Sequence, residues 1–423
     1  MKIYLDMIGC RLNQSEIEIM ARQFSAAGHT LVGEPGDADL AVVNTCTVTA
    51  AAAADSRKII RRIHRSGVER IITTGCWSSL QPEQARDLPG VTEVISNNNK
   101  SELVSILFPR ELPIFDQEPI LRVAIPGNRQ RTRAFIKAQD GCRHSCTFCI
   151  TTIARGKSRS ESVESVVREV NAAVQSGIME AVLTGVQLGS WGKDLDPPLG
   201  LHDLVAAVLN ETGIPRLRLS SIEPWDIHPP LIELIQEDRV ARHLHLPLQS
   251  GSAMTLRRMA RAINPQTYQQ LVDQIRTKVP GIAITTDILT GFPGETEAEY
   301  REGLDFIRQM EFAAGHVFTY SAREGTPAAE YQDQVPHPVR KNRGAEIRAI
   351  LAVDGEKYRR GFLGKEMVTL WEQIEEDSNI ATGLTDNYLR VEAEALPEIW
   401  NTFSRVKIQE ITKDGVFGMI QQP

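Results

Sequence analysis

Short apolar runs alternate with longer helical stretches over the first 118 residues. The runs Ile3–Met7, Leu40–Val43 and Arg70–Thr73 have the length and composition of buried strands. The stretches Ser15–Ala27 and Ala50–Ser66 are typical of helices, and the second begins with alanines, the residue of highest helix propensity. This alternation predicts an N-terminal α/β domain, residues 1–118, with a parallel sheet and helices packed on its faces.

A longer α/β pattern fills residues 128–357, beyond a proline-containing linker that we place at 111–120. The strands that we expect are Ala134–Ala138, Ala181–Leu183, Leu217–Ser220, His243–Leu246, Ala283–Leu289 and His316–Tyr320. The helices that we expect between them are Ser162–Ser176, Leu201–Asn210, Leu231–Glu237, Pro265–Thr277 and Thr296–Met310. Such repeated units predict a complete or partial β/α barrel, in which reactive residues gather at the C-terminal strand ends.

The last segment, residues 360–423, changes to short strands separated by turns. The strands that we expect there are Val368–Gln373, Tyr388–Ala393, Arg405–Ile408 and Val416–Ile420. This pattern predicts a small all-β domain, with an OB-like barrel as one candidate. The segment carries 6 basic and 11 acidic residues, an unusual balance for a module that binds RNA.

The composition is that of a globular protein and narrows the function classes. Hydrophobic residues make up 42% and charged residues 24% of the 423 positions, which excludes a disordered or fibrous chain. The net charge of 47 − 54 = −7 argues against a protein that coats nucleic acid, although it permits local basic faces. The sequence contains no long apolar run and no apolar signal stretch near Met1. We therefore expect a cytoplasmic protein without a membrane span.

The candidate chemistry lies first in the loop Cys142-x3-Cys146-x2-Cys149, just past the first predicted barrel strand. Three thiolates in one loop can bind three irons of a [4Fe–4S] cluster and leave the fourth iron open. An open iron can chelate an amine and a carboxylate, as S-adenosylmethionine provides. The alternative is a zinc knuckle completed by His144, although structural zinc normally takes four protein ligands and the first spacing is unusual for it.

The other three cysteines, Cys10, Cys46 and Cys76, each follow a predicted strand of the N-terminal domain. Because the C-terminal ends of parallel strands lie along one edge of a sheet, these thiols are expected to converge on a second cluster. Gly9 and Gly75 would let the backbone approach it closely. The alternative is three ordinary buried cysteines, since free cysteine is often buried.

Six segments along the chain resemble the radical S-adenosylmethionine methylthiotransferases. They are Gly9–Gln14, Asn44–Cys46, Thr74–Cys76, Gly141–Cys149, His245–Ser252, and Asp287 together with Gly291–Glu295. The resemblance covers essentially the full length. It implies an N-terminal methylthiotransferase domain, a radical barrel and a C-terminal TRAM domain. It also implies S-adenosylmethionine as cofactor and two [4Fe–4S] clusters, with all six cysteines as ligands.

The branches of this family modify isopentenyl-adenosine in tRNA, threonylcarbamoyl-adenosine in tRNA, or an aspartate of a ribosomal protein. The segments Leu183–Gly192, Leu217–Pro224 and His316–Pro327 are most similar to the branch that adds a methylthio group to C2 of N6-threonylcarbamoyladenosine at position 37. Two features depart from that branch: Thr151–Ile153, where it more often has an Ile-Pro-Tyr type sequence, and the acidic C-terminal domain.

The resemblance implies two uses of S-adenosylmethionine. One molecule passes its methyl group to a sulfur at the second cluster, and another is cleaved reductively to a radical that attacks C2 of the adenine. The implied partners are a tRNA anticodon loop and an electron donor of the flavodoxin or ferredoxin type. Both cofactor sites must reach C2, so the edge of the sheet that carries Cys10 should face the barrel mouth.

Strand-end residues of the predicted barrel are the candidate contacts to S-adenosylmethionine. They are Thr184, Gly185, Glu223, Gln249, Ser250 and Gly291. The alternative is that they only form loops and caps. Arg323 follows the last predicted barrel strand and is the candidate partner of the threonylcarbamoyl carboxylate, since a buried unpaired carboxylate is costly; the alternative is a surface role.

Local basic groups are the expected contacts to RNA phosphates, with a solvated surface as the alternative. They are Arg57, Lys58, Arg61, Arg62, Arg65, Arg129, Arg131, Arg133, Arg155, Lys157, Arg159 and the stretch His337–Arg360. An anticodon loop suits this chemistry because its unstacked bases can be splayed into a pocket. Competing functions are the same reaction on isopentenyl-adenosine or on a protein aspartate, and a non-enzymatic iron–sulfur RNA-binding or sensor protein.

Overall fold

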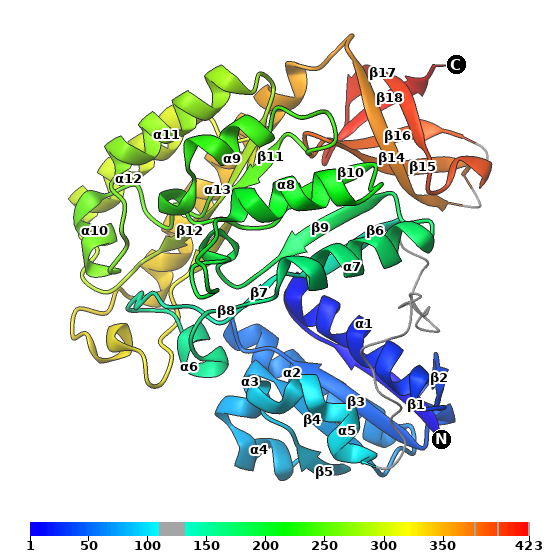
Figure 1. Ribbon diagram of the computed structural model, residues 1–423. Coiled ribbons are helices and arrows are strands. Elements are labelled where there is room, and N and C mark those ends of the chain that lie inside the picture. The colour runs from blue at the N-terminus through cyan, green and yellow to red at the C-terminus, as the bar shows by residue number, and fades with distance from the viewer. Residues whose placement is uncertain (110–131, 376–377, 396, 422–423) are drawn as a thin grey trace.

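The computed structural model describes residues 1–109, 132–375, 378–395 and 397–421. In Figure 1 these residues form an N-terminal sheet (blue), a central β/α unit (green to yellow) and a C-terminal β-barrel (orange to red). The predicted fold class is confirmed: α/β, with a partial β/α barrel and a small all-β domain. The predicted linker at 111–120 and the predicted domain bounds at 118 and 128 lie outside the described residues.

A five-stranded parallel sheet in the order β2-β1-β3-β4-β5 forms the N-terminal unit. Its strands are β1 (Lys2–Met7), β2 (Thr30–Val32), β3 (Leu40–Thr45), β4 (Ile71–Gly75) and β5 (Val91–Val94). Its helices are α1 (Arg11–Ala26), α2 (Ala50–Arg65), α3 (Cys76–Leu80), α4 (Pro82–Arg86) and α5 (Leu103–Leu107). Phe24 of α1 and Leu103 of α5 pack in one apolar cluster, and Ile60 of α2 and Trp77 of α3 pack in another. The sequence pattern misses the short edge strands β2 and β5.

Six strands form the partial barrel of the central unit, and all six were predicted. They are β6 (Arg133–Lys137), β9 (Glu180–Thr184), β10 (Arg216–Leu219), β11 (His243–His245), β12 (Ala283–Thr290) and β13 (Ala314–Thr319). The parallel sheets β6-β9-β10 and β11-β12-β13 are joined by the bridges Leu217–Val240 and Ser221–His245. Among the described residues no pairing joins β13 back to β6, so the barrel is partial.

Helices surround this partial barrel. They are α6 (Thr151–Arg155), α7 (Val163–Gln175), α8 (Leu201–Glu211), α9 (Pro229–Leu234), α10 (Ala253–Arg258), α11 (Pro265–Lys278), α12 (Glu297–Met310) and α13 (His337–Arg360), and a small ribbon pairs β7 (Gln139–Asp140) with β8 (Arg159–Ser160). The start of α12 follows from its sequence, because the side chains of Thr296 and Glu299 each accept the other's backbone N–H. No helix in the described ranges is long and apolar enough to cross a lipid bilayer.

The C-terminal unit is a closed barrel in the order β14-β15-β16-β18-β17. Its strands are β14 (Glu366–Glu375), β15 (Ile380–Thr385), β16 (Arg390–Glu394), β17 (Phe403–Ile411) and β18 (Val416–Ile420). The sequence pattern misses β15. It also starts the next strand too early, because Tyr388 lies in a turn with a φ of 66°.

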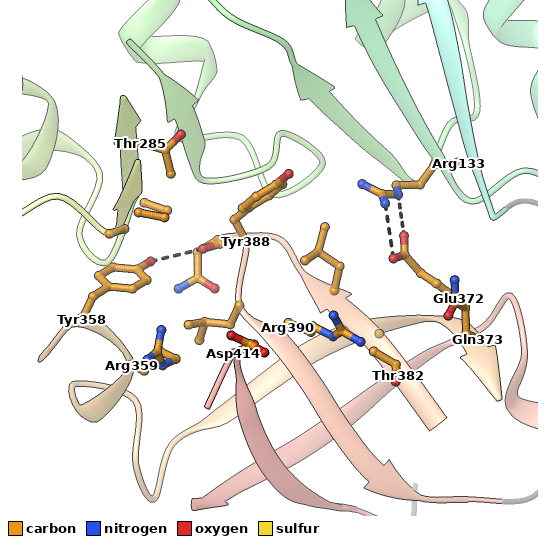
Figure 2. A pocket seen from close by; sticks show the side chains of 17 residues that line it. Arg133, Thr285, Tyr358, Arg359, Glu372, Gln373, Thr382, Tyr388, Arg390 and Asp414 are labelled. Carbon is orange, nitrogen blue, oxygen red and sulfur yellow. Dashed lines mark hydrogen bonds and ion pairs between the residues drawn. The ribbon is translucent and has the colours of Figure 1, made fainter. Parts of the chain in front are cut away.

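Arginines of β10 attach this barrel to the central unit. Arg216 donates to the carbonyl of Leu384 and Arg218 to the carbonyl of Thr385, each at 3.0 Å. The buried carboxylate of Glu180 neutralises both guanidinium groups. A cavity of about 430 Å³ lies at this junction, between the partial barrel, α13 and the C-terminal barrel (Figure 2). The contacts lie toward the N-terminal strand ends, which leaves the C-terminal ends for chemistry.

Candidate active site

The loop after β7 gathers Cys142, Cys146 and Cys149. The N–H groups of His144 and Thr151 point at the Sγ atoms of Cys142 and Cys149, each at 3.4 Å. Burial raises the pKa of Cys142 to about 11, and the charges of Cys149 and Cys146 contribute to this rise. The three thiols therefore share one site, and backbone N–H groups are directed at two of its sulfurs, as they are around iron–sulfur clusters.

An ion pair between buried Arg261 and half-buried Glu223 flanks this loop. Both terminal nitrogens of the Arg261 guanidinium bind the carboxylate of Glu223, at 3.0 and 2.6 Å, and Nη1 lies 4.0 Å from Sγ of Cys146. The guanidinium also stacks over Trp225, whose Nε1 donates to Nε2 of His144 at 3.0 Å. That nitrogen of His144 is therefore engaged within the protein, which weakens the zinc alternative. Glu223, a predicted contact to S-adenosylmethionine, lies at the site but is already bound to Arg261.

The turn after β9 packs against the cysteine loop. The hydroxyl of Thr184 is buried and donates to the carbonyl of Ile136 at 3.0 Å, so its side chain is directed into the fold. A Cβ at Gly185 would come within 2.8 Å of Oε1 of Gln139, the atom that also accepts the N–H of Gln187. Only the backbone of Thr184 and Gly185 is thus left for the predicted contact to S-adenosylmethionine, which stays a prediction.

The later strand-end candidates differ in accessibility. Gln249 has a φ of 69° and is partly exposed, whereas Ser250 is buried. The N–H of Gly291 donates to Glu295 at 3.0 Å, and the side chain of Arg340 covers this glycine so closely that a Cβ would lie 2.0 Å from its Cγ. Gly291 is therefore held inside the protein, and a cofactor contact by any of the three stays a prediction.

The other three cysteines follow neighbouring strands of the N-terminal sheet. Cys10 precedes α1, Cys46 follows β3, and Cys76 begins α3, after β4. Burial raises the pKa of Cys46 to about 11, and the nearby charges of Cys10 and Cys76 contribute to this rise, so the three thiols lie together as the sequence predicts. Gly9 has a φ of 116°, and a Cβ there would lie 2.6 Å from Sγ of Cys46, so the site requires glycine.

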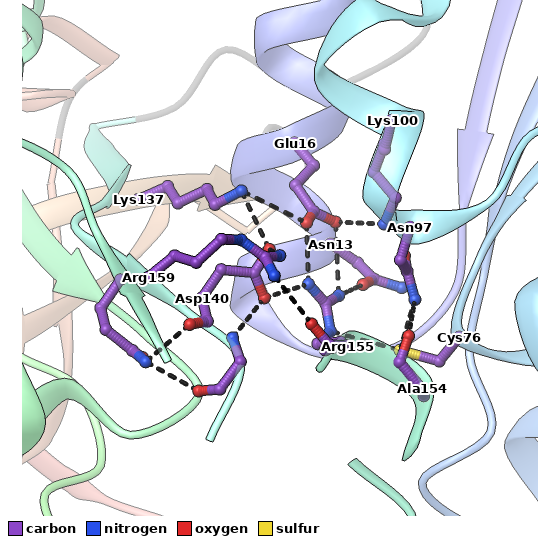
Figure 3. Close-up of polar contacts among 12 residues, drawn as sticks. Asn13, Glu16, Cys76, Asn97, Lys100, Lys137, Asp140, Ala154, Arg155 and Arg159 are labelled. Atoms are coloured by element: carbon purple, nitrogen blue, oxygen red, sulfur yellow. Dashed lines mark hydrogen bonds and ion pairs between the residues drawn. The ribbon is translucent and has the colours of Figure 1, made fainter. Parts of the chain in front are cut away.

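Arg155 joins the two cysteine sites (Figure 3). It ends α6, the helix that follows the loop of Cys142, yet its Nε lies 3.3 Å from Sγ of Cys76. Its Nη1 binds Glu16 at 2.8 Å and Asp140 at 3.0 Å. The side chain is only 2% exposed, so the predicted RNA contact at Arg155 is wrong. The position of Arg155 shortly after Cys149 is the sequence signal for this role, but the surrounding basic residues favoured an RNA contact instead.

Glu16 is the carboxylate at the centre of this network, and the sequence pattern does not predict it. Its carboxylate also binds Nζ of Lys100 at 2.8 Å. Burial alone would raise the pKa of Glu16, but the charges of Lys100 and Arg155 hold it well below its usual range. Nothing in the sequence spacing marks this network, because Lys100 meets Glu16 only in the folded N-terminal domain and Arg155 reaches Glu16 across the domain interface.

Arg323 lies where the partial barrel meets the second cysteine site. Its Nη2 donates to the carbonyl of Val48 at 3.3 Å. Burial lowers the pKa of Arg323, whereas the nearby Cys46 raises it, so the guanidinium and this thiol are neighbours. Together with Arg155, this contact shows that the cysteine-bearing edge of the sheet faces the barrel mouth.

A row of polar side chains occupies the partial barrel. The carboxylate of Asp287 lies 3.3 Å from Nε2 of His245 and 3.3 Å from Nδ1 of His316. Burial alone would raise the pKa of Asp287, but the hydrogen bonds from His245 and His316 hold it well below its usual range. The bond to Asp287 in turn raises the pKa of His316, and burial and the charge of Arg11 lower it only in part.

We expect the substitution Asp287→Asn to return His316 toward the ordinary histidine pKa of about 6.5. In the unsubstituted chain, the contact between Asp287 and His316 stabilises the fold fully at pH values below the ordinary histidine pKa. This contribution is lost as the pH rises through the higher pKa that His316 has in the folded protein. It is also lost in acid, when Asp287 takes up a proton. An NMR titration of labelled histidine checks this, and the far-ultraviolet circular dichroism spectrum reports whether the fold is intact. An unchanged titration of His316 would contradict the assigned contact.

The predicted basic groups divide into exposed and buried ones. On α2, Lys58, Arg61, Arg62 and Arg65 are exposed and remain available to phosphates. On α13, Arg343 is buried against Glu295, so the prediction is wrong for this member of the stretch. Arg133 pairs with Glu372 of the C-terminal barrel, whereas Arg129 and Arg131 lie outside the described residues.

The donor sets fit two iron–sulfur clusters. The six cysteines form two sets of three, and in each set a thiol lies beside a buried guanidinium that is held by a carboxylate. A thiolate set of this kind suits a cluster that keeps one iron open to a further ligand. Within the described ranges, no three His, Cys, Asp or Glu side chains lie close enough together to hold a single metal ion.

Two family models match the chain. The model described as "Uncharacterized protein family UPF0004" matches residues 2–96, and that of the radical SAM superfamily matches residues 136–307. Among solved structures, the radical S-adenosylmethionine methyltransferase TsrM of Kitasatospora setae is similar, with a TM-score of 0.56 at 15% identity over 78% of this chain and 77% of that one. This likeness concerns the fold alone.

Curated relatives match nearly the whole chain. Threonylcarbamoyladenosine tRNA methylthiotransferase MtaB of Bacillus subtilis is 33% identical, over 95% of this chain and 92% of the relative. MtaB of Thermotoga maritima is 32% identical, over 98% and 96%. The tRNA-2-methylthio-N(6)-dimethylallyladenosine synthase of Clostridium tetani is 30% identical, over 90% and 88%. The chain therefore belongs to the radical S-adenosylmethionine methylthiotransferases that act on tRNA, a family that uses S-adenosylmethionine and two [4Fe–4S] clusters.

Proposed function

We propose that the protein adds a methylthio group to C2 of N6-threonylcarbamoyladenosine at position 37 of tRNA. The observation that carries this proposal is the position of Arg323, a guanidinium held beside Cys46 where the partial barrel meets the second cysteine site. The threonylcarbamoyl group carries a carboxylate, and a guanidinium is its natural partner in a partly buried site. The relatives named MtaB support the same substrate.

We assign one cluster to each cysteine set. Cys142, Cys146 and Cys149 would hold the cluster that supplies the electron for cleavage of S-adenosylmethionine, and Cys10, Cys46 and Cys76 the one that supplies sulfur. The chain itself positions the adenine between these sites and excludes water from the interface. The exposed arginines of α2 would bind phosphates of the anticodon loop. A one-electron donor of the flavodoxin or ferredoxin type completes the system.

Iron content tests this assignment directly. We expect about eight irons in each anaerobically reconstituted chain, and about four after Cys142, Cys146 and Cys149 are all replaced by Ala, because each thiol set binds one four-iron cluster. Colorimetric iron and sulfide assays give the counts. A parent chain that takes up stoichiometric zinc and no iron would contradict both assignments.

The nucleosides of tRNA decide the substrate. In a strain that lacks the gene, we expect threonylcarbamoyladenosine to accumulate without its 2-methylthio derivative, and mass spectrometry of digested tRNA to show this. A second candidate substrate is isopentenyl-adenosine, which is also called dimethylallyl-adenosine. The relatives at about 30% identity whose names contain dimethylallyladenosine favour it. If only the methylthio derivative of isopentenyl-adenosine disappears, the proposed substrate is wrong while the chemistry stands.

A further inference from the structure

Arg155 contacts the N-terminal cysteine site from the opposite domain. Its backbone ends α6, which starts at Thr151, two residues after Cys149. Its Nε nevertheless reaches across the interface to Sγ of Cys76 at 3.3 Å. In Figure 3 the guanidinium points from α6 toward Cys76, and the carbonyl of neighbouring Ala154 accepts a hydrogen bond from Asn97 of the N-terminal domain at 2.8 Å. One short helix thus ties the two cysteine sites together.

Every nitrogen of this guanidinium has a partner. Besides the contact of Nε, Nη1 binds Glu16 and Asp140 at 2.8 and 3.0 Å, and Nη2 binds Oδ1 of Asn13 at 2.7 Å. Glu16 and Asn13 belong to α1, whereas Asp140 belongs to the central unit. The exposed fractions of Arg155, Glu16 and Asp140 are only 2%, 4% and 6%. A side chain bound on both sides of an interface, out of water, has one orientation.

Arg261 provides a contrast. It lies 4.0 Å from Sγ of Cys146 and binds Glu223 with both terminal guanidinium nitrogens. All three residues belong to the central unit, so this arginine makes no tie between domains. Arg155 is different because its thiol partner and its carboxylate partner Glu16 lie in the N-terminal domain.

We propose that Arg155 is a positioning residue that holds the second cluster site against the radical site and donates a hydrogen bond to the sulfur of Cys76. The proposal rests on the assignment of Cys10, Cys46 and Cys76 as ligands of that cluster. A donor N–H and a positive charge beside a ligand sulfur stabilise the reduced, more negative cluster. Arg155 therefore raises the reduction potential of the second cluster in addition to fixing its place.

A redox titration followed by electron paramagnetic resonance tests this. The parent is the chain with Cys142, Cys146 and Cys149 replaced by Ala, which isolates the second cluster. In that chain we expect Arg155→Gln to shift the one-electron reduction equilibrium about tenfold toward the oxidised form, which is a potential lower by about 59 mV. The matched control is Arg159→Gln. Arg159 also pairs with Asp140, at 3.6 Å, but is half exposed, so its replacement should leave the potential unchanged.

A conservative variant keeps the test valid if Arg155→Gln loses the second cluster. Arg155→Lys keeps a charge beside Glu16 but cannot span from Glu16 to Cys76, so we expect an intermediate potential. It is titrated in place of Arg155→Gln if the latter keeps fewer than about four irons. A potential equal to that of the parent, in whichever variant retains the cluster, overturns the proposal. The titration contains no tRNA, so it is independent of the proposed substrate, and an iron-free parent would refute the ligand assignment instead.

Discussion

Replacement of Cys46 by Ala should abolish methylthiolation while reductive cleavage of S-adenosylmethionine continues. Cys46 is buried beside Cys10 and Cys76, on the N-terminal sheet, whereas the loop of Cys142 lies in the other domain. Loss of one ligand leaves only two thiolates for the second cluster. The cluster is then lost, and the sulfur donor is lost with the cluster. The cleavage site keeps all three of its cysteines. The assay is the simultaneous measurement of 5′-deoxyadenosine and methylthiolated tRNA nucleoside by mass spectrometry.

The matched control for this experiment is Cys142→Ala. It removes a thiol from the other site, so both 5′-deoxyadenosine and the modified nucleoside should disappear. The two variants together distinguish a divided function from general misfolding, because a misfolded chain would lose both products in either case. Full methylthiolation by Cys46→Ala would show that this thiol is not an essential ligand.

Replacement of Arg323 by Ala should weaken modification of threonylcarbamoyladenosine tRNA by about 2–5 kcal/mol, the usual cost of removing one partner from a desolvated charge pair. This corresponds to a fall of about 30- to 5000-fold in kcat/KM. Arg323 is only partly buried in the free protein, so the full effect requires that the substrate cover it. Cleavage of S-adenosylmethionine should change little, because Arg323 lies by Cys46 and not by the cleavage loop.

Two comparisons make this test specific. Arg308→Ala removes an arginine that lies on α12, is half exposed and pairs with Asp305, so it should leave both activities unchanged. A synthetic anticodon stem-loop with unmodified adenosine at position 37 lacks the carboxylate, and Arg323→Ala should affect its binding much less. If Arg323→Ala acts normally on threonylcarbamoyladenosine, the residue assignment fails, whereas the substrate proposal then depends on the nucleosides alone.

Local sequence patterns predicted most of the longer regular elements of the central unit. The six barrel strands are present near their predicted positions. Five of them are mostly buried, whereas β13 is exposed or half-buried throughout, and the helices between the strands repeat the signal. The short strands β2 and β5 and the strand β15 were missed. The three residues of β2 are too few to show a hydrophobic pattern. In β15 the pattern is interrupted by Gly383, and glycine is uncommon in strands.

The sequence also determined where the thiols would gather. Cys10, Cys46 and Cys76 each follow a strand, and strand order in a parallel sheet converts that position into a shared edge. The loop of Cys142 needs no tertiary information, since its ligands are close neighbours along the chain. Position at a strand end and spacing within a loop are local properties, and for this reason both cysteine sets could be predicted.

Only the tertiary structure decided which charged residues serve these thiols. The sequence pattern predicts Arg155 as one member of a basic surface cluster. In the structure it is buried, because Glu16 and Asp140, which belong to two different domains, neutralise its charge. Arg323 is adjacent to Cys46 although 277 positions separate them, since the domain interface brings them together. A buried ion pair depends on the distance between side chains in space, and no periodicity or spacing along this chain encodes that distance.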